Sequence, residues 1–201
     1  MSEKRLPVIT INRQYAAYGR TTAALLSERL GLMYYDKDFV KKTVAESGFD
    51  FEEVKNRGED ITPGNKFIND LMNATVGTYP DYIRKLYLAE RQVILELAKE
   101  PCIIVGRCAN HVLREEKVPV FSIFLYGDLE KRVKRASELA ENGNEDLVKY
   151  IKKRDTMRNN FYKTFTGTDI TDCTNYNICL DTTLIPPEQC ADIICGILEN
   201  M

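Results

Sequence analysis

The chain has 201 residues, of which 44% are hydrophobic and 29% charged, and its formal net charge at pH 7 is −2. These values are ordinary for a globular protein and allow one domain with a substantial core. Because positive and negative charges nearly cancel, the protein has no overall basic field, and the composition does not favour a nucleic-acid or anionic-membrane partner. The composition excludes neither an enzyme nor a binding module. Any anion site must therefore be local.

No targeting or membrane signal is visible in the sequence. The first five residues lead directly into a strand pattern, and no apolar run approaches the length that crosses a bilayer. We therefore expect a cytoplasmic protein without a membrane partner. The sequence leaves the oligomeric state open.

The six cysteines do not form a metal-ligand or disulfide pattern, because no closely spaced pair is matched by a second pair or by histidines. Cys102, Cys179 and Cys195 lie in apolar runs and are expected to pack as small hydrophobic residues. The only histidine, His111, is expected on a helix face rather than as a catalytic base.

The first predicted elements are a strand, a loop and a helix. Residues 8–11 form a short β-branched run, residues 12–22 are mostly polar or small, and a helical apolar stripe then ends at Gly31. A strand-turn-helix junction directs free backbone N–H groups and the positive end of the helix at one point. This arrangement suits a phosphate group.

The loop matches the phosphate-binding signature G-x-x-x-x-G-K-[ST] in part. Gly19 and Thr21 fit it, Gln14 stands where the first glycine is expected, and Arg20 replaces the lysine. Arginine keeps the positive charge and can bind two oxygens at once. The alternative is an ordinary turn between strand and helix in which Arg20 is solvated.

The remaining patterns alternate between strands and helices. In the first half we predict a strand at 32–35, an N-cap at Asp36, a helix at 37–45, a helical turn at 50–55, a polar loop at 56–65 and a helix at 81–98. In the second half we predict strands at 102–105, 118–126 and 178–180, helices at 129–141, 145–161 and 187–198, a turn at 106–110 and an exposed loop at 162–176.

This alternation predicts a mainly parallel, doubly wound α/β sheet, in which ligands bind outside the carboxyl ends of the strands. Polar residues follow the predicted strands at these ends: Gly19 and Arg20, Asp36 and Asp38, Arg107, and Asp181. We therefore expect them to converge on one edge. Separately, Asp36 and Asp181 suit helix caps, and Arg107 could pair with a carboxylate.

Five ordered motifs carry a resemblance to a known family. They are Ile11-Asn12-Arg13-Gln14-Tyr15 before a Gly-Arg-Thr turn, Tyr35-Asp36-Lys37-Asp38, Ile104-Val105-Gly106-Arg107-Cys108-Ala109, Arg154-Asp155-x-x-Arg158, and the stretch 175–183. Through them the chain resembles the cytidylate-kinase-like proteins of the P-loop nucleoside-monophosphate kinase superfamily. The family has Gly-Ser-Gly-Gly-Arg where this chain has residues 16–20, Ala-Ala-Tyr-Gly-Arg.

The resemblance covers nearly the whole chain and implies a three-layer P-loop NTPase fold in a single domain, residues 1–201. It implies a five-stranded parallel sheet, a mobile helical acceptor-binding region at about 37–80, and a lid at about 145–176. The implied cofactors are ATP and Mg²⁺. The implied substrate is a small nucleotide, a nucleoside monophosphate such as CMP.

The resemblance also implies roles for individual residues. The donor phosphates would be bound by Tyr18, Gly19, Arg20, Thr21 and Thr22, with the Thr21 hydroxyl on Mg²⁺. The acceptor would be faced by Asp36 and Arg107, with Arg132 and Arg135 as phosphate-clamping arginines nearby. Asp38 completes an Asp-x-Asp pair similar to the acceptor and metal site of shikimate-kinase-like enzymes. Arg154 and Arg158 would be lid arginines and, with Arg20, would act in catalysis.

The spacing of the lid arginines agrees with this assignment but does not require it. Arg154 and Arg158 are four residues apart and share one helix face, where Asp155 can brace a neighbouring arginine. The same residues would also occur on a charged helix face that is exposed to solvent.

Three functions therefore remain open. The first is an ATP-dependent kinase of a nucleoside monophosphate or of a non-nucleotide acceptor such as shikimate. The second is a nucleotide-binding sensor or pseudo-kinase, because Ala16, Ala17 and Tyr18 alter the phosphate loop. The third is an interaction module, which would require these arginines to be paired away from a closed cleft.

Overall fold

The protein forms a five-stranded sheet with helices on both faces, seen in a computed structural model that describes residues 5–36 and 81–201. The strands are β1 (Val8–Arg13), β2 (Tyr34–Tyr35), β3 (Ile103–Val105), β4 (Val120–Tyr126) and β5 (Ile178–Asp181). They are parallel and lie in the order β2-β3-β1-β4-β5. The predicted three-layer α/β fold with a five-stranded parallel sheet is confirmed.

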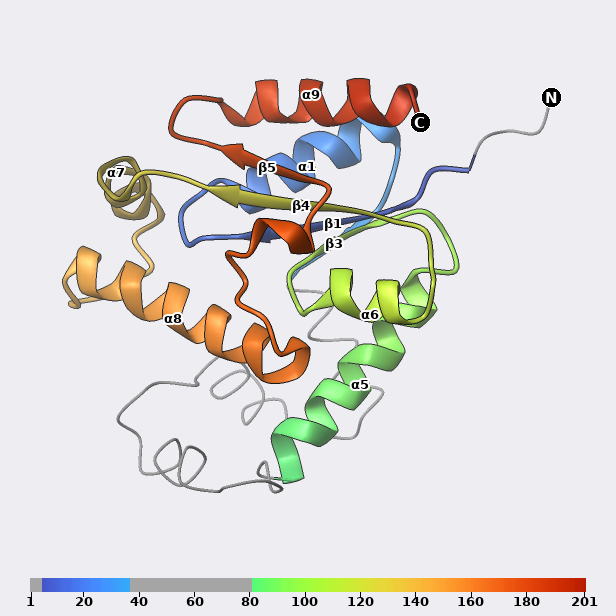
Figure 1. Cartoon of the computed structure of the whole chain (residues 1–201). Helices are drawn as coiled ribbons and strands as arrows, with labels where there is room; N and C mark the ends of the chain where they lie inside the picture. The colour runs from blue at the N-terminus through green and yellow to red at the C-terminus, as the bar shows by residue number, and fades with distance from the viewer. Residues whose placement is uncertain (1–4, 37–80) are drawn as a thin grey trace.

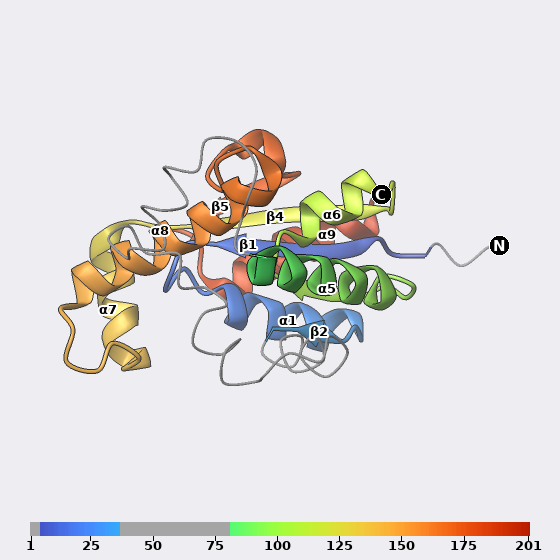
Figure 2. The ribbon, with the colours of Figure 1, turned by 90° about the horizontal axis from the view of Figure 1, so that it is seen from below.

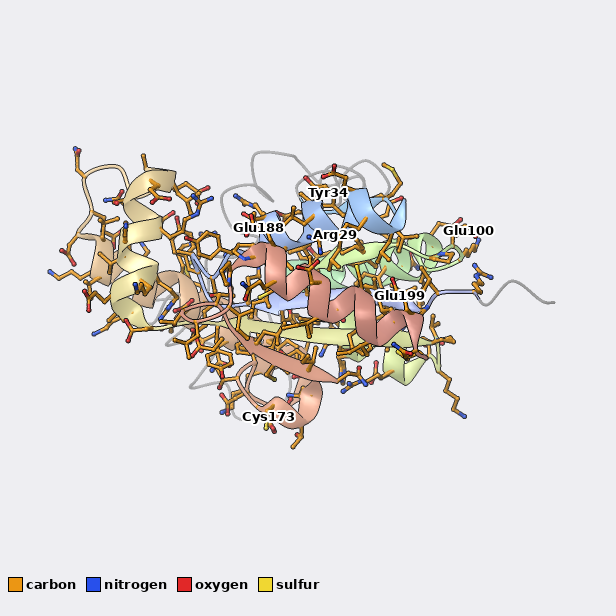
Figure 3. The ribbon with its side chains drawn as sticks, turned by 90° about the horizontal axis from the view of Figure 1, so that it is seen from above. Arg29, Tyr34, Glu100, Cys173, Glu188 and Glu199 are labelled. Carbon is orange, nitrogen blue, oxygen red and sulfur yellow. The ribbon has the colours of Figure 1, made fainter. Side chains whose placement is uncertain are left out.

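Two helices cover one face of the sheet (Figure 1). They are α1 (Gly19–Leu30) and α9 (Pro187–Glu199), which pack over a core formed with the inward side chains of the central strands. Arg29 of α1 lies beside α9 in Figure 3, and its NH1 is 2.6 Å from the Asp192 carboxylate. The pairing joins the first and last helices of the chain.

The other face is covered by α5 (Asp81–Leu97), α6 (Ala109–Glu115) and α8 (Leu147–Thr166), as the view from below shows (Figure 2). The helix α7 (Leu129–Leu139) lies beyond the carboxyl end of β4 (Figure 1). Because β1 is central, its side chains are buried in both layers: Val8 packs on the α5 and α6 side, and Ile9 and Ile11 pack on the α1 and α9 side. A nearly continuous apolar run is the expected sequence of such a strand.

The sequence was wrong about the stretch after 161. The helix α8 continues to Thr166 and ends at Gly167, whose φ of 76° is the left-handed conformation of a helix C-cap. Tyr162 and Tyr176, expected in an exposed loop, are 3% and 8% exposed. Their burial depends on distant partners: the Tyr162 hydroxyl accepts a hydrogen bond from Asn110 Nδ2, and the Tyr176 hydroxyl accepts one from Asn12 Nδ2.

Two smaller differences concern short elements. The turn expected after β3 continues into α6, and the strand expected at 32–35 is confined to Tyr34–Tyr35. The elements predicted at 37–45, 50–55 and 56–65, together with Asp38 and the helix that Asp36 would cap, lie outside the described residues. No helix among residues 5–36 and 81–201 has the length and apolar character needed to cross a membrane.

Candidate active site

Two adjoining cavities lie at the carboxyl edge of the sheet. The first is an open cavity of about 510 Å³, counting the space at its mouth. It is lined by the loop after β1 and by α7 and α8, through residues 13–21, Arg135, Leu139, Glu141, Arg154 and Arg158. We call it the loop cavity.

The second cavity lies beside the ends of β1 and β3. Its lining residues are Asn12, Arg13, Asp36, Val105, Gly106, Arg107, Cys108, Met157, Arg158, Phe161, Tyr162 and Ile170. We call it the strand-end cavity. Arg13 and Arg158 line both cavities, so the two spaces meet at these side chains.

The loop after β1 adopts a glycine-like backbone without the usual glycines. Ala16 and Tyr18 have φ values of 61° and 56°, in the left-handed region, where a side chain costs about 1–2 kcal/mol. Packing compensates for this strain, because Tyr15 and Ala17 are buried. Gln14 fixes the start of the loop by accepting a hydrogen bond from the Gly127 backbone N–H at 3.1 Å.

The helix α1 begins at Gly19, in the wall of the loop cavity. The first N–H groups of a helix have no partner within it, and the helix dipole makes this end positive. Such an end is a ready site for phosphate. Tyr18 therefore does not prevent the chain from entering a helix at the wall of the cavity.

An acidic residue of α8 binds the backbone of the loop after β1. Asp155 accepts a hydrogen bond from the Tyr15 backbone N–H at 2.6 Å and pairs with Arg132 NH1 at 2.6 Å. Arg132 also donates to the carbonyls of Gly127 and Tyr15. The structure thus places Arg132 under the loop and in the lining of neither cavity, which differs from the role expected from the sequence.

Arg20 lies in the loop cavity between two carboxylates. Its Nε is 2.6 Å from Asp36 Oδ2 and its NH1 is 3.2 Å from Glu141 Oε1. Burial opposes the charged form of Arg20, but the hydrogen bond and charge of Asp36, with those of Glu141, raise its pKa above the usual value. Glu141 also accepts a hydrogen bond from the Tyr15 hydroxyl at 2.9 Å. The pKa of Tyr15 is raised by burial and by Glu141.

Three further arginines stand around the loop. The Arg135 guanidinium lies 5.0 Å from the centroid of the Tyr18 ring, and that of Arg158 lies 5.6 Å from the centroid of the Tyr15 ring. Arg154 lines the same cavity. With Arg13 and Arg20, these side chains give the loop cavity five arginines against one carboxylate, Glu141. Asp36 and Glu138, which lie outside this lining, pair with three of the arginines and offset part of the charge, so the lining has an excess of cationic side chains.

Arg107 lines the strand-end cavity and forms an ion pair with a buried carboxylate. Its NH1 is 2.9 Å from Glu90 Oε1, and the Glu90 side chain is 1% exposed. Residues 106–108 all have left-handed φ values, of 83°, 59° and 55°, at the end of β3. This turn directs the chain from the sheet into α6. The carboxylate partner anticipated for Arg107 is thus Glu90.

The residues present suit Mg²⁺ bound mainly through a nucleotide. No cluster of three or more His, Cys, Asp or Glu side chains that could hold a metal lies within 5–36 and 81–201. Mg²⁺ commonly takes one or two protein oxygens and completes its shell with phosphates and water. Thr21 lines the loop cavity and can offer its hydroxyl. Thr22, by contrast, is fully buried and does not line the cavity.

Most of the site residues predicted from the sequence line the two cavities, but the sequence did not point to Arg13, to Glu141 or to the contact of Gln14 with Gly127. Arg13 was part of a quoted motif, which was the only signal for it. Of the predicted residues, the structure brings together Tyr18, Gly19, Arg20, Thr21, Arg135, Arg154 and Arg158 in the loop cavity, and Asp36, Arg107 and Arg158 in the strand-end cavity. Asp181 accepts a hydrogen bond from the Thr183 N–H, as a turn residue does.

Comparison with known proteins decides the family. Residues 8–184 match the model of the cytidylate kinase-like family. The chain belongs to this family. A curated relative, the cytidylate kinase of Thermoplasma volcanium, is 24% identical over 160 residues, which cover 79% of each chain.

Two solved structures share the fold. A protein of unassigned function from Eubacterium ventriosum has a TM-score of 0.72 at 21% identity, with 97% of this chain and 99% of that chain covered. The shikimate kinase of Acinetobacter baumannii in complex with shikimate has a TM-score of 0.56 at 13% identity, with 97% and 94% covered. At these identities the likeness shows the fold alone. Family and fold together support a kinase of a nucleotide or another small molecule.

Proposed function

We propose that this family member transfers the γ-phosphoryl group of ATP to a nucleoside monophosphate, with CMP as the first candidate acceptor. The observation that carries the proposal is the pair of arginine-lined cavities that meet at Arg13 and Arg158. Direct transfer between two bound phosphates needs adjoining anion sites of this kind. A protein that only binds one nucleotide needs only one.

The loop cavity is the proposed donor site. The N-terminus of α1 and Arg20 would bind the β- and γ-phosphates of ATP, and the Thr21 hydroxyl would hold Mg²⁺. When bound, Mg²⁺ would neutralise part of the negative charge of the donor phosphates. In the free protein Arg20 contacts the carboxylates of Asp36 and Glu141. On nucleotide binding it would contact phosphate oxygens instead, because a guanidinium group binds a pair of oxygens on either kind of anion.

The strand-end cavity is the proposed acceptor site. Arg13, Arg107 and Arg158 offer guanidinium groups to a phosphate, while Phe161 and Met157 add apolar surface that suits a flat base. Asp36 is the carboxylate on this wall that can accept hydrogen bonds from an amino group of the acceptor. These features favour a small anionic acceptor with a ring.

The proposed mechanism is alignment and charge stabilisation. An acceptor phosphate is already an anion, so the protein needs no dedicated general base. Arg20, Arg154 and Arg158 would stabilise negative charge on the transferring group, and we propose that the segment 145–176, which carries two of them, acts as the lid. Excluding water from the closed site would limit hydrolysis of ATP.

Two alternatives, a different acceptor class and a sensor without turnover, are each supported by a specific observation. A carboxylate ring acceptor such as shikimate is kept because arginines bind carboxylate as well as phosphate and because a shikimate kinase shares the fold. A sensor without turnover is kept because Arg20 is held by Asp36 and Glu141 in the structure. The interaction module is not favoured, because Arg20, Arg154 and Arg158 all line an open cavity.

The test is ADP formation from Mg-ATP in the presence of CMP, dCMP, UMP, AMP, GMP or shikimate, each added separately, with calorimetric ATP binding on the same sample. ADP formation that depends on one of the nucleotides supports the proposal and names the acceptor. Dependence on shikimate alone would replace the acceptor class. Tight ATP binding without turnover would leave the sensor.

A further inference from the structure

The end of β1 carries an arginine for which the sequence predicted no role. Arg13 is the last residue of β1, its side chain is 11% exposed, and it lines both the loop cavity and the strand-end cavity. It comes from the rigid central strand, whereas Arg158, the other residue shared by the cavities, comes from α8. Arg13 therefore marks the place where donor and acceptor would meet.

Two glycines give the Arg13 side chain its path. A Cβ atom added to Gly19 would lie 2.8 Å from Arg13 Cγ, and one added to Gly106 would lie 2.5 Å from Arg13 NH1. Both distances are closer than carbon and nitrogen atoms approach without a bond. The stem thus crosses the first residue of α1, and the guanidinium lies against the turn after β3. Any larger residue at either position would displace it.

The charges around Arg13 place it within reach of phosphate. Its NH2 is 3.7 Å from Asp36 Oδ1, and the other oxygen of the same carboxylate contacts Arg20. Its backbone carbonyl accepts a hydrogen bond from Arg158 NH1 at 3.4 Å. Asp36 thus lies between the arginine of the phosphate loop and the arginine between the cavities. A phosphoryl group in transit could occupy the same position between these cations.

We infer that Arg13 is a catalytic residue that contacts the phosphoryl group as it passes between the cavities. The inference rests on the proposed function. In the step, the bond from the γ-phosphorus to the β–γ bridging oxygen of ATP breaks as an acceptor phosphate oxygen bonds to that phosphorus. ADP leaves with the electron pair, and no proton moves. The Arg13 guanidinium offers N–H donors to the equatorial oxygens, where charge is spread in the transition state.

Arg13→Gln, Arg13→Lys and the matched control Arg91→Gln test this role. Arg91 pairs with Glu115 and Glu116 on the surface, away from both cavities. The first readout is kcat for ADP formation with the acceptor found for the unmodified protein. The second is calorimetric affinity for Mg-ADP, measured alone and then with aluminium fluoride and the same acceptor, which together mimic the transition state.

We expect Arg13→Gln to lower kcat by about 100- to 1,000-fold and Arg13→Lys by less, because lysine keeps the charge but loses the fork. Affinity for Mg-ADP alone should change less than about threefold, whereas the gain on adding aluminium fluoride and acceptor should be lost. A purely structural role would instead weaken both affinities together. Arg91→Gln should behave as the unmodified protein.

The outcomes separate the inference from the proposed function. If the unmodified protein transfers phosphate but Arg13→Gln keeps kcat within about twofold, the inference is overturned and the kinase stands. If the unmodified protein transfers to no acceptor, the proposed function fails and takes the inference with it. Should Arg13→Gln not fold, Arg13→Lys decides: unchanged kcat and an unchanged aluminium fluoride response would overturn the role.

Discussion

Asp155 of α8 and Arg132 of α7 form an ion pair, with 2.6 Å between Oδ2 and NH1, beside the loop that follows β1. The same carboxylate accepts the Tyr15 backbone N–H, so one acidic residue fixes both an arginine and the loop. Arg132 is 8% exposed and donates to two backbone carbonyls of the same region. The position of the loop therefore depends on side chains more than 100 residues away in sequence.

Asp155→Asn should destabilise the protein and loosen the loop. Removing one partner of a largely buried ion pair leaves a charge uncompensated, and we expect the free energy of unfolding to fall by about 2–3 kcal/mol. Mg-ATP should bind about tenfold more weakly. Denaturant unfolding and calorimetry measure the two effects. The control is Glu96→Gln, which breaks an exposed pair with Lys99 and should lower the free energy of unfolding by no more than about 0.5 kcal/mol. Equal stabilities of the two variants would contradict a stabilising role for the Asp155–Arg132 pair.

Arg20→Ala should abolish measurable Mg-ATP binding while the protein stays folded. The side chain is half exposed and its partners, Asp36 and Glu141, can be hydrated once it is removed. Calorimetry measures the affinity, and far-UV circular dichroism checks the fold. Unchanged ATP affinity in a folded variant would remove Arg20 from the donor site.

Glu141→Gln should act in the opposite direction and strengthen Mg-ATP binding by about three- to tenfold. Glu141 is the one carboxylate among the residues that line the loop cavity, and it competes with phosphate for Arg20. Glutamine can still accept the Tyr15 hydroxyl proton in a hydrogen bond. The comparison is with Glu145→Gln, whose carboxylate pairs with Lys153, because neither of these residues lines the cavity. Weaker binding in Glu141→Gln alone would show that Glu141 helps to hold the nucleotide site together.

Glu90→Gln should raise the KM of the acceptor and destabilise the protein. Glu90 is buried and pairs with Arg107, which lines the strand-end cavity. Loss of the carboxylate leaves the arginine without its counter-charge, at a cost of about 3 kcal/mol. We expect the acceptor KM to rise about tenfold with little change in ATP affinity. Steady-state kinetics with each substrate varied in turn make the distinction, and a rise confined to the ATP KM would argue against Arg107 as an acceptor residue.

Cys173 should be the first cysteine to react with a thiol reagent in the native protein. It is exposed and lies at the rim of the molecule in Figure 3, whereas Cys102, Cys108 and Cys190 are buried. Burial raises the pKa of Cys102 and of Cys190 to about 11, which keeps both thiols in the unreactive protonated form at pH 8. Cys173→Ser should remove the fast phase of a dithionitrobenzoate reaction. Its persistence would show that another cysteine is accessible.

The sequence predicted the sheet and the turn after β1 because both depend on local patterns. Apolar runs such as Val8–Ile11 identify buried strands, and Gly31 identifies a helix end without reference to the rest of the chain. The motif around Gly19 and Arg20 predicts that this turn binds phosphate, which stays a prediction. Those parts needed no knowledge of distant contacts.

The remaining features depend on tertiary contacts. Tyr162 and Tyr176 looked like loop residues because their hydroxyl groups are bound by Asn110 of α6 and Asn12 of β1, which are far away in the sequence. The family resemblance implied a phosphate-clamping role for Arg132, and no local pattern shows that Asp155 binds this arginine. Arg13 was missed because its path becomes visible only when Gly19 and Gly106 are brought together. The site residues inferred from the family stay predictions for the experiments above.

The most direct test of the central claim is phosphorus NMR of the purified protein mixed with Mg-ATP and CMP. Adjoining donor and acceptor cavities predict that ADP and CDP appear in equal amounts, without inorganic phosphate. Release of inorganic phosphate in place of CDP would show that water, not a nucleotide bound in the strand-end cavity, receives the phosphoryl group. An unchanged ATP spectrum with CMP and with each of the other acceptors would contradict the kinase.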